Sequence, residues 1–302
     1  MPPSDSMNEP VSEQAAPDLP PINVAIAKEM LKEAKQIMDA LGVVFFLRQG
    51  TCLGPIRDND LIPWDDDVDL GSVIGLHGLT EKTIDIVAAA FEENGYVLNV
   101  GRTDHNIYVE MTKQSNKMDW NCYWIFDDHI FHYPGVRIPL HLFTDLKEID
   151  FIGEKFLVPN PPEEYLSIKY GSNWMTPKKR AWMTDVVQMI PETSVSGRTG
   201  KLKQLLTTTI LPWRAVKLRV LDDAGIPVAG AEILIAGYNQ SKTNKQGYAR
   251  FYLPCDDWYA LVIRYGNHEE VLYEEQMKPG GSYVYTPDPL SASGRLSVLS
   301  RP

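Results

Sequence analysis

The sequence has few cysteines and no long apolar run. Cys52, Cys122 and Cys255 are widely spaced and odd in number, which excludes a disulfide framework and fits no zinc-binding pattern. No run of about 18 apolar residues, the length that a membrane-spanning helix requires, occurs in the chain. Residues 1–21 lack the basic-then-apolar order of a signal peptide. These absences predict reduced thiols and a cytoplasmic location.

Positive charge is also scarce. The 302 residues contain 29 Lys and Arg against 40 Asp and Glu, so the formal net charge is −11. A general nucleic-acid-binding protein would be expected to show a basic stripe, so we predict no nucleic-acid partner. Hydrophobic residues make up 44% of the chain and charged residues 23%, which is ordinary for a globular protein. The length is sufficient for two domains.

The segment Gly50–Leu70, GTCLGPIRDNDLIPWDDDVDL, contains a dense carboxylate cluster. Asp65, Asp67 and Asp69 lie at positions i, i+2 and i+4, so in an extended segment they would share one face while Asp66 points to the other. Three anions on one face repel each other unless a cation neutralises them. Hard oxygen ligands of this kind suit Mg²⁺ or Mn²⁺. We therefore predict a metal site at Asp65, Asp67 and Asp69.

Before the cluster, the sequence predicts a short phosphate-binding turn. Gly50 and Gly54 have no Cβ to keep backbone N–H groups away from a phosphate, and Thr51 adds a hydroxyl donor. Arg57 would supply a fixed positive fork for the same group. The alternative for Arg57 is a surface ion pair with an aspartate of residues 58–60.

A further acid and two histidines follow. Asp119 interrupts an apolar strand, where a carboxylate is costly to bury unless it is paired or bound to metal. It would complete the metal site or act as a base; the alternative is an edge-strand acid that faces water. His129 and His132 either form a second metal site or belong to a surface hairpin.

Hydrophobic periodicity predicts an α+β domain followed by a β domain. A helix over residues 22–41 ends at Gly42, a buried strand covers 43–47, and a helix follows Thr80. Strands are predicted over three later segments, which are 96–100, 106–111 and 118–126. From residue 213 on, short alternating strands with Gly, Asn and Asp turns indicate an antiparallel sandwich.

The predicted organisation has four parts. Residues 1–20 form a disordered tail, 21–212 a catalytic domain with its linker, 213–290 a small all-β sandwich, and 291–302 a second disordered tail.

GTCLGPIR…LIPWDDDVDL resembles the signature of the LicD/fukutin family. KMDWNCYWIF (Lys117–Phe126) and FIGEKFLVPNPPEEYLSIKYGSNWMTP (Phe151–Pro177) are similar to two later motifs of that family, in the same order. The resemblance covers about residues 23–185 and implies a nucleotidyltransferase fold, a mixed sheet flanked by helices. The later pattern D-x-x-G-x-P-V-x-G-A resembles the carboxypeptidase-regulatory-like β-sandwich module, which implies an accessory role for that part.

The LicD/fukutin resemblance implies transfer of phosphocholine or a phospho-alditol, such as ribitol phosphate, onto a glycan hydroxyl. The donor would be CDP-choline or a CDP-alditol, and the acceptor a glycan or lipid-linked glycan. In this hypothesis Asp67 and Asp69 hold Mg²⁺ (or Mn²⁺), Asp65 adds a ligand, and Asp119 accepts a proton. Gly50, Thr51, Gly54 and Arg57 bind the donor phosphates.

Two other functions remain open at this stage. The same carboxylates would serve a nucleotidyltransferase that transfers a nucleoside monophosphate to a small acceptor. A non-catalytic glycan-binding or assembly protein would retain the acidic strand without using it. A lipid-linked acceptor would place the protein at the inner face of the membrane. There, peripheral contact would be helped by a group of basic residues, which are Arg198, Lys201, Lys203, Arg214, Lys217 and Arg219.

Overall fold

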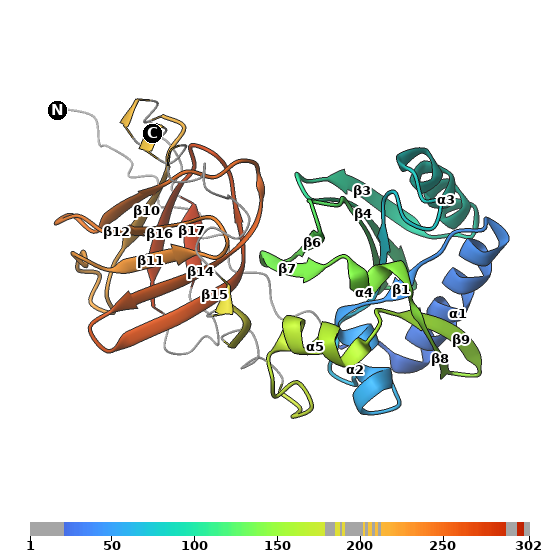
Figure 1. The fold of residues 1–302 in the computed structure, drawn as a ribbon. Helices are drawn as coiled ribbons and strands as arrows, with labels where there is room; N and C mark the ends of the chain where they lie inside the picture. The colour runs from blue at the N-terminus through green and yellow to red at the C-terminus, as the bar shows by residue number, and fades with distance from the viewer. Residues whose placement is uncertain are drawn as a thin grey trace, which may run out of the picture. The chain divides into compact units, whose positions relative to one another are not determined.

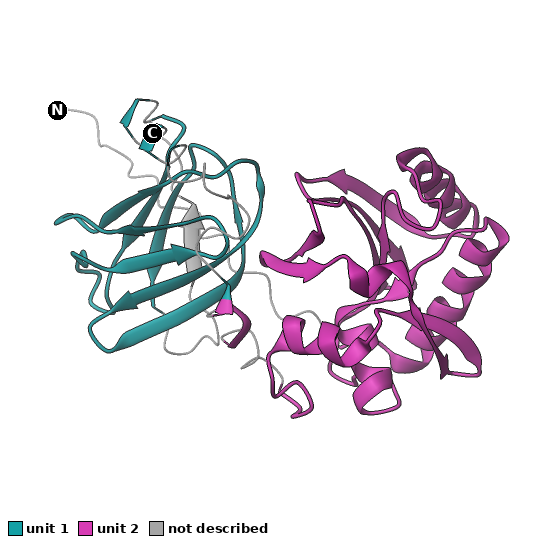
Figure 2. Ribbon diagram, in the orientation of Figure 1, with its two compact units in different colours: residues 1–17, 190–302 teal, residues 18–189 magenta. Residues whose placement is uncertain are grey.

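The computed structural model describes residues 21–178, 185–187, 189–190, 202, 205–206, 209–210, 213–287 and 295–298. The chain divides into two compact units, with residues 18–189 in one and residues 190–302 in the other (Figure 2). This boundary falls earlier in the sequence than the predicted one after residue 212. The predicted tail over residues 1–20 lies outside the described residues.

A five-stranded mixed sheet forms the centre of the first unit (Figure 1). Strands β2 and β5 are parallel neighbours, and the other neighbouring pairs are antiparallel. The register of β2 against β5 places Asp69 opposite Asp119. Two residues that are far apart in the sequence but were predicted to serve the same site therefore meet inside the sheet. In sheet order the strands are β1 (Phe46–Leu47), β2 (Asp67–Val73), β5 (Asn116–Tyr123), β4 (Asn106–Lys113) and β3 (Val97–Arg102).

Two amphipathic helices pack together beside this sheet. Helix α1 (Val24–Ala40) begins at Asn23, whose side chain accepts two backbone N–H bonds, and Gly42 follows its end with φ +66°. Helix α3 (Glu81–Glu93) is capped by Thr80. Helix α1 contacts α3 and the strands β2 and β5. Both predicted helices are confirmed, and no helix in the described part of the chain is long and apolar enough to cross a membrane.

The predicted glycine turn is instead a helix. The buried strand predicted over 43–47 is reduced to the two residues of β1, and helix α2 (Gln49–Arg57) begins two residues after it. Helix α2 packs against α5 (Pro162–Tyr170). The remaining elements of the unit are β6 (His129–His132), β7 (Val136–Pro139), α4 (His141–Thr144), β8 (Lys147–Phe151) and β9 (Glu154–Val158), which form two hairpins with α4 between them.

The second unit contains two four-stranded sheets that share one apolar core, which confirms the predicted all-β sandwich. The predicted tail over residues 291–302 is wrong for Arg295–Val298, because these residues form β17 and pair with β16. One sheet consists of β13 (Tyr248–Phe251), β10 (Val216–Val220), β16 (Ser282–Thr286) and β17. The other consists of β12 (Asn239–Lys242), β11 (Glu232–Ile235), β14 (Asp257–Tyr265) and β15 (His268–Met277).

Candidate functional site

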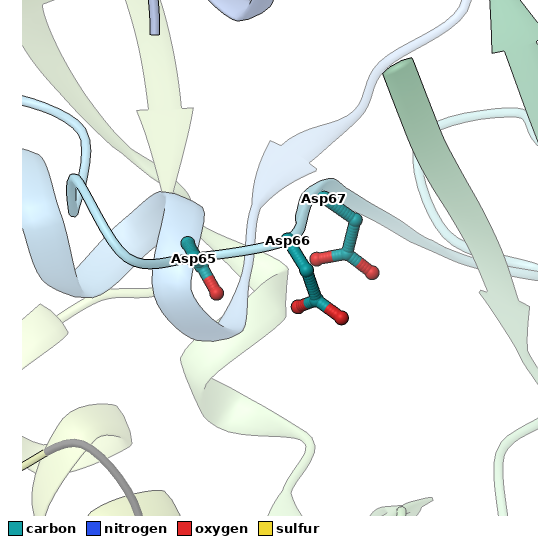
Figure 3. A group of neighbouring side chains, drawn as sticks. All are labelled: Asp65, Asp66 and Asp67. Carbon is teal, nitrogen blue, oxygen red and sulfur yellow. The ribbon is translucent and has the colours of Figure 1, made fainter. Parts of the chain in front are cut away.

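Three consecutive aspartates converge at the start of β2 (Figure 3). Asp65, Asp66 and Asp67 each offer a carboxylate oxygen, and these atoms all lie within 4.8 Å of one another. The prediction that Asp66 points away from the others is wrong. Strand β2 begins only at Asp67, so the alternation of a strand does not apply to the two residues before it. Asp69, which was predicted to share this group, is not part of it.

Asp69 is instead buried and held by its neighbours. Its Oδ1 atom lies 2.5 Å from Nη2 of Arg48 and accepts a hydrogen bond of 3.0 Å from Nε2 of Gln49. Its backbone N–H donates to Oγ1 of Thr51 at 2.8 Å. The carboxylate is therefore paired and fixed in orientation, whereas the three aspartates of the cluster have no such cationic partner among the ion pairs of the described residues.

Arg48 is the residue of this site that the sequence analysis missed. Its side chain is 5% exposed, and it donates from Nε to the carbonyl oxygen of Leu70 and from Nη1 to the hydroxyl of Tyr123. Burial acts to lower the pKa of Arg48, but the Asp69 carboxylate helps to raise it above its ordinary value, so the guanidinium stays charged. The sequence did contain a signal for this role, because Arg48 is a single basic residue directly after the apolar run over residues 43–47.

The residues predicted to bind phosphate lie in helix α2. A Cβ on Gly50 would lie 1.9 Å from Oδ2 of Asp65, so only a glycine lets this carboxylate approach the helix backbone. Thr51 is buried and receives the N–H of Asp69. Gly54 does not take part in the contact with Asp65. A Cβ on Gly54 would lie 2.4 Å from the backbone oxygen of Asp60. Gly54 therefore serves the packing of the loop after α2.

Arg57 forms an ion pair at the other end of α2. Its Nε and Nη2 atoms donate to the two carboxylate oxygens of Asp58, at 2.9 Å and 2.6 Å. This pair is the alternative that the sequence left open, and the binding of a phosphate by Arg57 stays a prediction. The Nε and Nη2 atoms of Arg57 thus already have a hydrogen-bond acceptor within the protein.

Asp119 lies on β5 in the interior of the sheet, between β2 and β4, and its side chain is 15% exposed. The alternative of an edge-strand acid facing water is therefore wrong. Its Oδ2 atom pairs with Nζ of Lys117 at 2.9 Å, while Oδ1 is buried and has no hydrogen-bond partner among the described residues. Burial raises the pKa of Asp119, and Lys117 acts in the opposite direction. An unpartnered buried oxygen is costly, so Oδ1 is suited to receive a ligand.

The crowding of carboxylates shifts their protonation. Burial, followed by the charges of Asp69 and Asp66, raises the pKa of Asp65 to about 8. The pKa of Asp67 is raised well above its ordinary value by burial and then by Asp69, Asp119 and the two preceding aspartates. A divalent cation would relieve this repulsion. The clustered oxygens of Asp65, Asp66 and Asp67 are the hard donors that Mg²⁺ and Mn²⁺ prefer, so the residues fit the metal.

The two histidines of β6 have separate neighbours. His129 contacts Oδ1 of Asp128 and Nη2 of Arg137, at 3.1 Å and 3.0 Å. His132 is buried, and its ring stacks on Tyr123, the tyrosine that binds Arg48. The two rings thus belong to different environments. Among the described residues, the candidate metal-binding group is the aspartate cluster and not this pair.

A mixed sheet flanked by helices, with clustered carboxylates beside the first turn of a helix, defines a nucleotidyltransferase-type domain. Residues 42–161 match the family described as LicD/FKTN/FKRP, nucleotidyltransferase domain. The first unit of this chain therefore contains a domain of the LicD/FKTN/FKRP family, and the family resemblance seen in the sequence is confirmed. The resemblance of the second unit to a carboxypeptidase-regulatory-like module stays a prediction.

Several curated proteins are similar to about half of the chain. Ribitol-5-phosphate transferase FKTN of Homo sapiens is 31% identical over 51% of this chain and 34% of its own length. Ribitol 5-phosphate transferase FKRP of Homo sapiens is 27% identical over 50% of this chain and 32% of its own length. An uncharacterised protein of Rickettsia prowazekii is 24% identical over 47% of this chain and 53% of its own length. The chain thus spans about a third of the length of these two transferases.

Among solved structures, the antibiotic-resistance factor ANT(2'')-Ia aligns with 55% of this chain and 83% of its own. The TM-score is 0.37 at 12% sequence identity, which is too low to support a functional comparison.

Proposed function

We propose that the first unit is a metal-dependent transferase that moves a phospho-alditol, such as ribitol phosphate, or phosphocholine from a CDP-linked donor to a glycan hydroxyl. The observation that carries this proposal is the convergence of Asp65, Asp66 and Asp67 inside the region that matches the family. The names of two relatives, both ribitol-phosphate transferases, support the phospho-alditol. A glycan or a lipid-linked glycan would serve as acceptor.

The clustered aspartates would hold Mg²⁺ or Mn²⁺. When bound, the metal would supply positive charge that offsets the charge of the donor pyrophosphate and of the leaving nucleotide. Asp67 is central to this arrangement. After burial, the charges of four other aspartates raise the pKa of its carboxyl group, and these are Asp69, Asp119, Asp65 and Asp66.

Asp69 was predicted as a metal ligand, but its Oδ1 atom is already bound by Arg48 and Gln49. Its proposed role is therefore to fix the start of β2 and to add negative charge at the cluster. Arg48 keeps that buried charge compensated. Without this partner, Asp69 would be a buried, unpaired anion, which is strongly unfavourable.

The remaining residues would bind the donor phosphates and activate the acceptor. Gly50 and Thr51 belong to the first turn of α2, where backbone N–H groups lack a carbonyl partner within the helix and the helix dipole favours an anion. Asp119 would accept the proton of the acceptor hydroxyl through Oδ1, the oxygen without a partner. Lys117 holds the other oxygen of this carboxylate.

The first test is a thermal-shift screen of the full chain with CDP-ribitol, CDP-glycerol, CDP-choline and nucleoside triphosphates, with and without Mg²⁺. The donor should stabilise the protein more than the other nucleotides, and only with the metal. Asp67→Asn should remove the stabilisation by donor and metal. Glu275→Gln, which changes a carboxylate of the sandwich, is the matched control and should not.

Product analysis then separates the three candidate functions. Release of CMP together with a phospho-modified glycan supports the proposed reaction. Release of pyrophosphate from a nucleoside triphosphate would replace it with nucleotidyl transfer. If Asp67→Asn keeps its fold and neither nucleotide nor metal stabilises the natural protein, the proposal is wrong and a non-catalytic role remains.

A further inference from the structure

Helix α2 begins with a residue in an uncommon backbone conformation. Gln49 has φ +46°, in the left-handed region that residues other than glycine rarely adopt. Arg48, the residue before it, is extended, with φ −128° and ψ 172°. The chain therefore turns sharply at Gln49 between β1 and the helix. Such a conformation persists only where contacts with the rest of the protein hold it, and residues of this kind cluster at functional sites.

Two hydrogen bonds hold Gln49 in place. Its backbone N–H donates to the hydroxyl of Tyr165 at 3.1 Å, and its side-chain Nε2 donates to Oδ1 of Asp69 at 3.0 Å. Tyr165 belongs to α5, which packs against α2 (Figure 1), and Asp69 belongs to β2. Gln49 is thus attached to a neighbouring helix through its backbone and to the central sheet through its side chain.

Gln49 directly precedes the two backbone donors proposed above for the donor phosphates. Among the described residues, no backbone carbonyl accepts a hydrogen bond from the N–H of Gly50 or of Thr51, as is usual in the first turn of a helix. The peptide group that carries the N–H of Gly50 is rigid and attached to Gln49, so its direction depends on the backbone angles of Gln49. A return of Gln49 to a negative φ would therefore redirect this N–H relative to β2.

The hydroxyl of Tyr165 is itself fixed in the interior of the unit. The side chain is fully buried, and burial raises its pKa well above the ordinary value, so the hydroxyl keeps its proton. Since the oxygen accepts the N–H of Gln49, the proton is free to point to Nε2 of His132, which lies 3.4 Å away. Burial lowers the pKa of His132, which leaves this ring neutral and able to accept.

We propose that Tyr165 and Gln49 are positioning residues for the transfer reaction. The Tyr165 hydroxyl holds Gln49 in its left-handed conformation, and Gln49 in turn directs the N–H groups of Gly50 and Thr51 toward the donor phosphates. This inference rests on the function proposed above. Among the described residues, no hydrogen bond joins either positioning residue to the aspartate cluster, so the pair should affect binding of the nucleotide and not of the metal.

Calorimetric titration of the full chain with CDP in the presence of Mn²⁺ tests the inference. CDP carries the two phosphates that every CDP-linked donor shares. Tyr165→Phe removes only the hydroxyl and keeps the ring, which packs against His132 and Phe143. The variant should lower the affinity for CDP by about tenfold, because a displaced binding group loses much of its interaction with the ligand. Its affinity for Mn²⁺ without nucleotide should stay unchanged.

Tyr96→Phe is the matched control in the same unit. Tyr96 is also buried, and its hydroxyl donates to Oε2 of Glu33 on α1 at 2.9 Å, so the variant removes a comparable hydrogen bond outside α2. It should bind CDP as the natural protein does. An equal loss of CDP affinity in the two variants would overturn the inference. So would a loss of Mn²⁺ affinity in Tyr165→Phe as large as its loss of CDP affinity, because the hydroxyl would then act only through the stability of the unit.

A double-variant cycle tests whether the two residues act together. Gln49→Ala removes the bond to Asp69 and should also weaken the binding of CDP. The loss in Tyr165→Phe/Gln49→Ala should be smaller than the product of the two single losses, because both changes release the same residue. Single losses that multiply would contradict the pair.

Failure of this inference can be told apart from failure of the proposed function. If the natural protein does not bind CDP in the presence of Mn²⁺, the proposed function fails and the positioning role fails with it. If the natural protein binds CDP and Tyr165→Phe binds it equally well, only the positioning role is wrong.

Discussion

The two units of the chain differ in how deeply their ion pairs are buried. In the first unit, the side chains of the Arg48–Asp69 ion pair are only 5% and 6% exposed. In the sandwich, the pairs Lys242–Glu232 and Arg264–Glu269 lie at the surface, with each side chain at least 36% exposed. The buried cluster of the sandwich is apolar, with tyrosine as its most polar member.

This difference bears on the stability of each unit. A buried ion pair is on average no more stabilising than apolar side chains of the same size, because both ions lose their hydration. The sandwich follows the more stable solution. The first unit keeps an ion pair with both side chains buried beside the aspartate cluster, which agrees with the site proposed above.

The largest test of this comparison is the removal of the buried cation. Arg48→Met leaves Asp69 buried without its partner and should lower the free energy of unfolding of the first unit by about 3–5 kcal/mol. The matched change in the sandwich, Arg264→Met, breaks an exposed pair with Glu269 and should cost less than about 1 kcal/mol. Chemical denaturation of the full chain, followed by probes in each unit, measures both.

Asp69→Asn provides the second half of that test. In this background the carboxylate charge is already gone, so Arg48→Met should cost less than it does in the natural protein. Equal costs for Arg48→Met and Arg264→Met would show that the buried pair is not special and would remove the contrast between the units.

The next effect concerns the contact between α2 and the cluster. Gly50→Ala adds a methyl group where Oδ2 of Asp65 now lies, and it should lower the affinity for Mn²⁺ by about tenfold or more without changing any charge. Gly71→Ala is the control, because its Cβ would lie 2.5 Å from the ring of Phe46 and its three nearest neighbouring atoms all belong to that ring. Calorimetric titration with Mn²⁺ should show reduced affinity only for Gly50→Ala.

A smaller effect is expected from pH. In the folded state Asp65 keeps its proton up to about pH 8, whereas an unfolded aspartate releases it near pH 4. The folded state thus binds more protons between these values, so the metal-free protein should lose stability as pH rises, by at most about 1.4 kcal/mol per pH unit for each such group. Mn²⁺ must displace these protons, and its stabilising effect should grow over the same range.

Thermal melts at steps of pH, with and without Mn²⁺, check this prediction. The sandwich contributes one similar group, because burial followed by Glu270 and Glu274 raises the pKa of Glu275 to about 8. Glu275→Gln should remove that share of the pH dependence and leave the Mn²⁺ effect unchanged. An Mn²⁺ effect that is the same at pH 5 and pH 8 would contradict the assignment of the cluster as the metal site.

The smallest expected effect is that of Arg57→Gln. Since Asp58 already occupies Nε and Nη2, the variant should change donor binding little. Its affinity for the donor nucleotide should resemble that of Arg102→Gln, which breaks another pair in the same unit, with Glu81. If Arg57→Gln lowers the affinity for the donor tenfold and Arg102→Gln does not, Arg57 binds a donor phosphate, as the sequence predicted.

Much of the fold was accessible from local patterns. The helices α1 and α3 carry a regular apolar stripe and recognisable ends, Gly42 and Thr80, and the strands β3 to β5 overlap the three predicted segments. Helix α2 was missed because its glycines suggest a turn. It is held by contacts with distant residues, such as the bond from the N–H of Gln49 to the hydroxyl of Tyr165.

The sequence by itself determined that a dense group of aspartates follows an apolar strand and that Asp119 lies on another strand, because composition and periodicity are local properties. Only the tertiary structure decided which carboxylate is neutralised and which remain together. Arg48 reaches Asp69, Leu70 and Tyr123, the last of them 75 residues away in the chain. Such partners are chosen by sheet register and burial, which depend on the packing of the whole unit and not on the spacing of residues in the sequence.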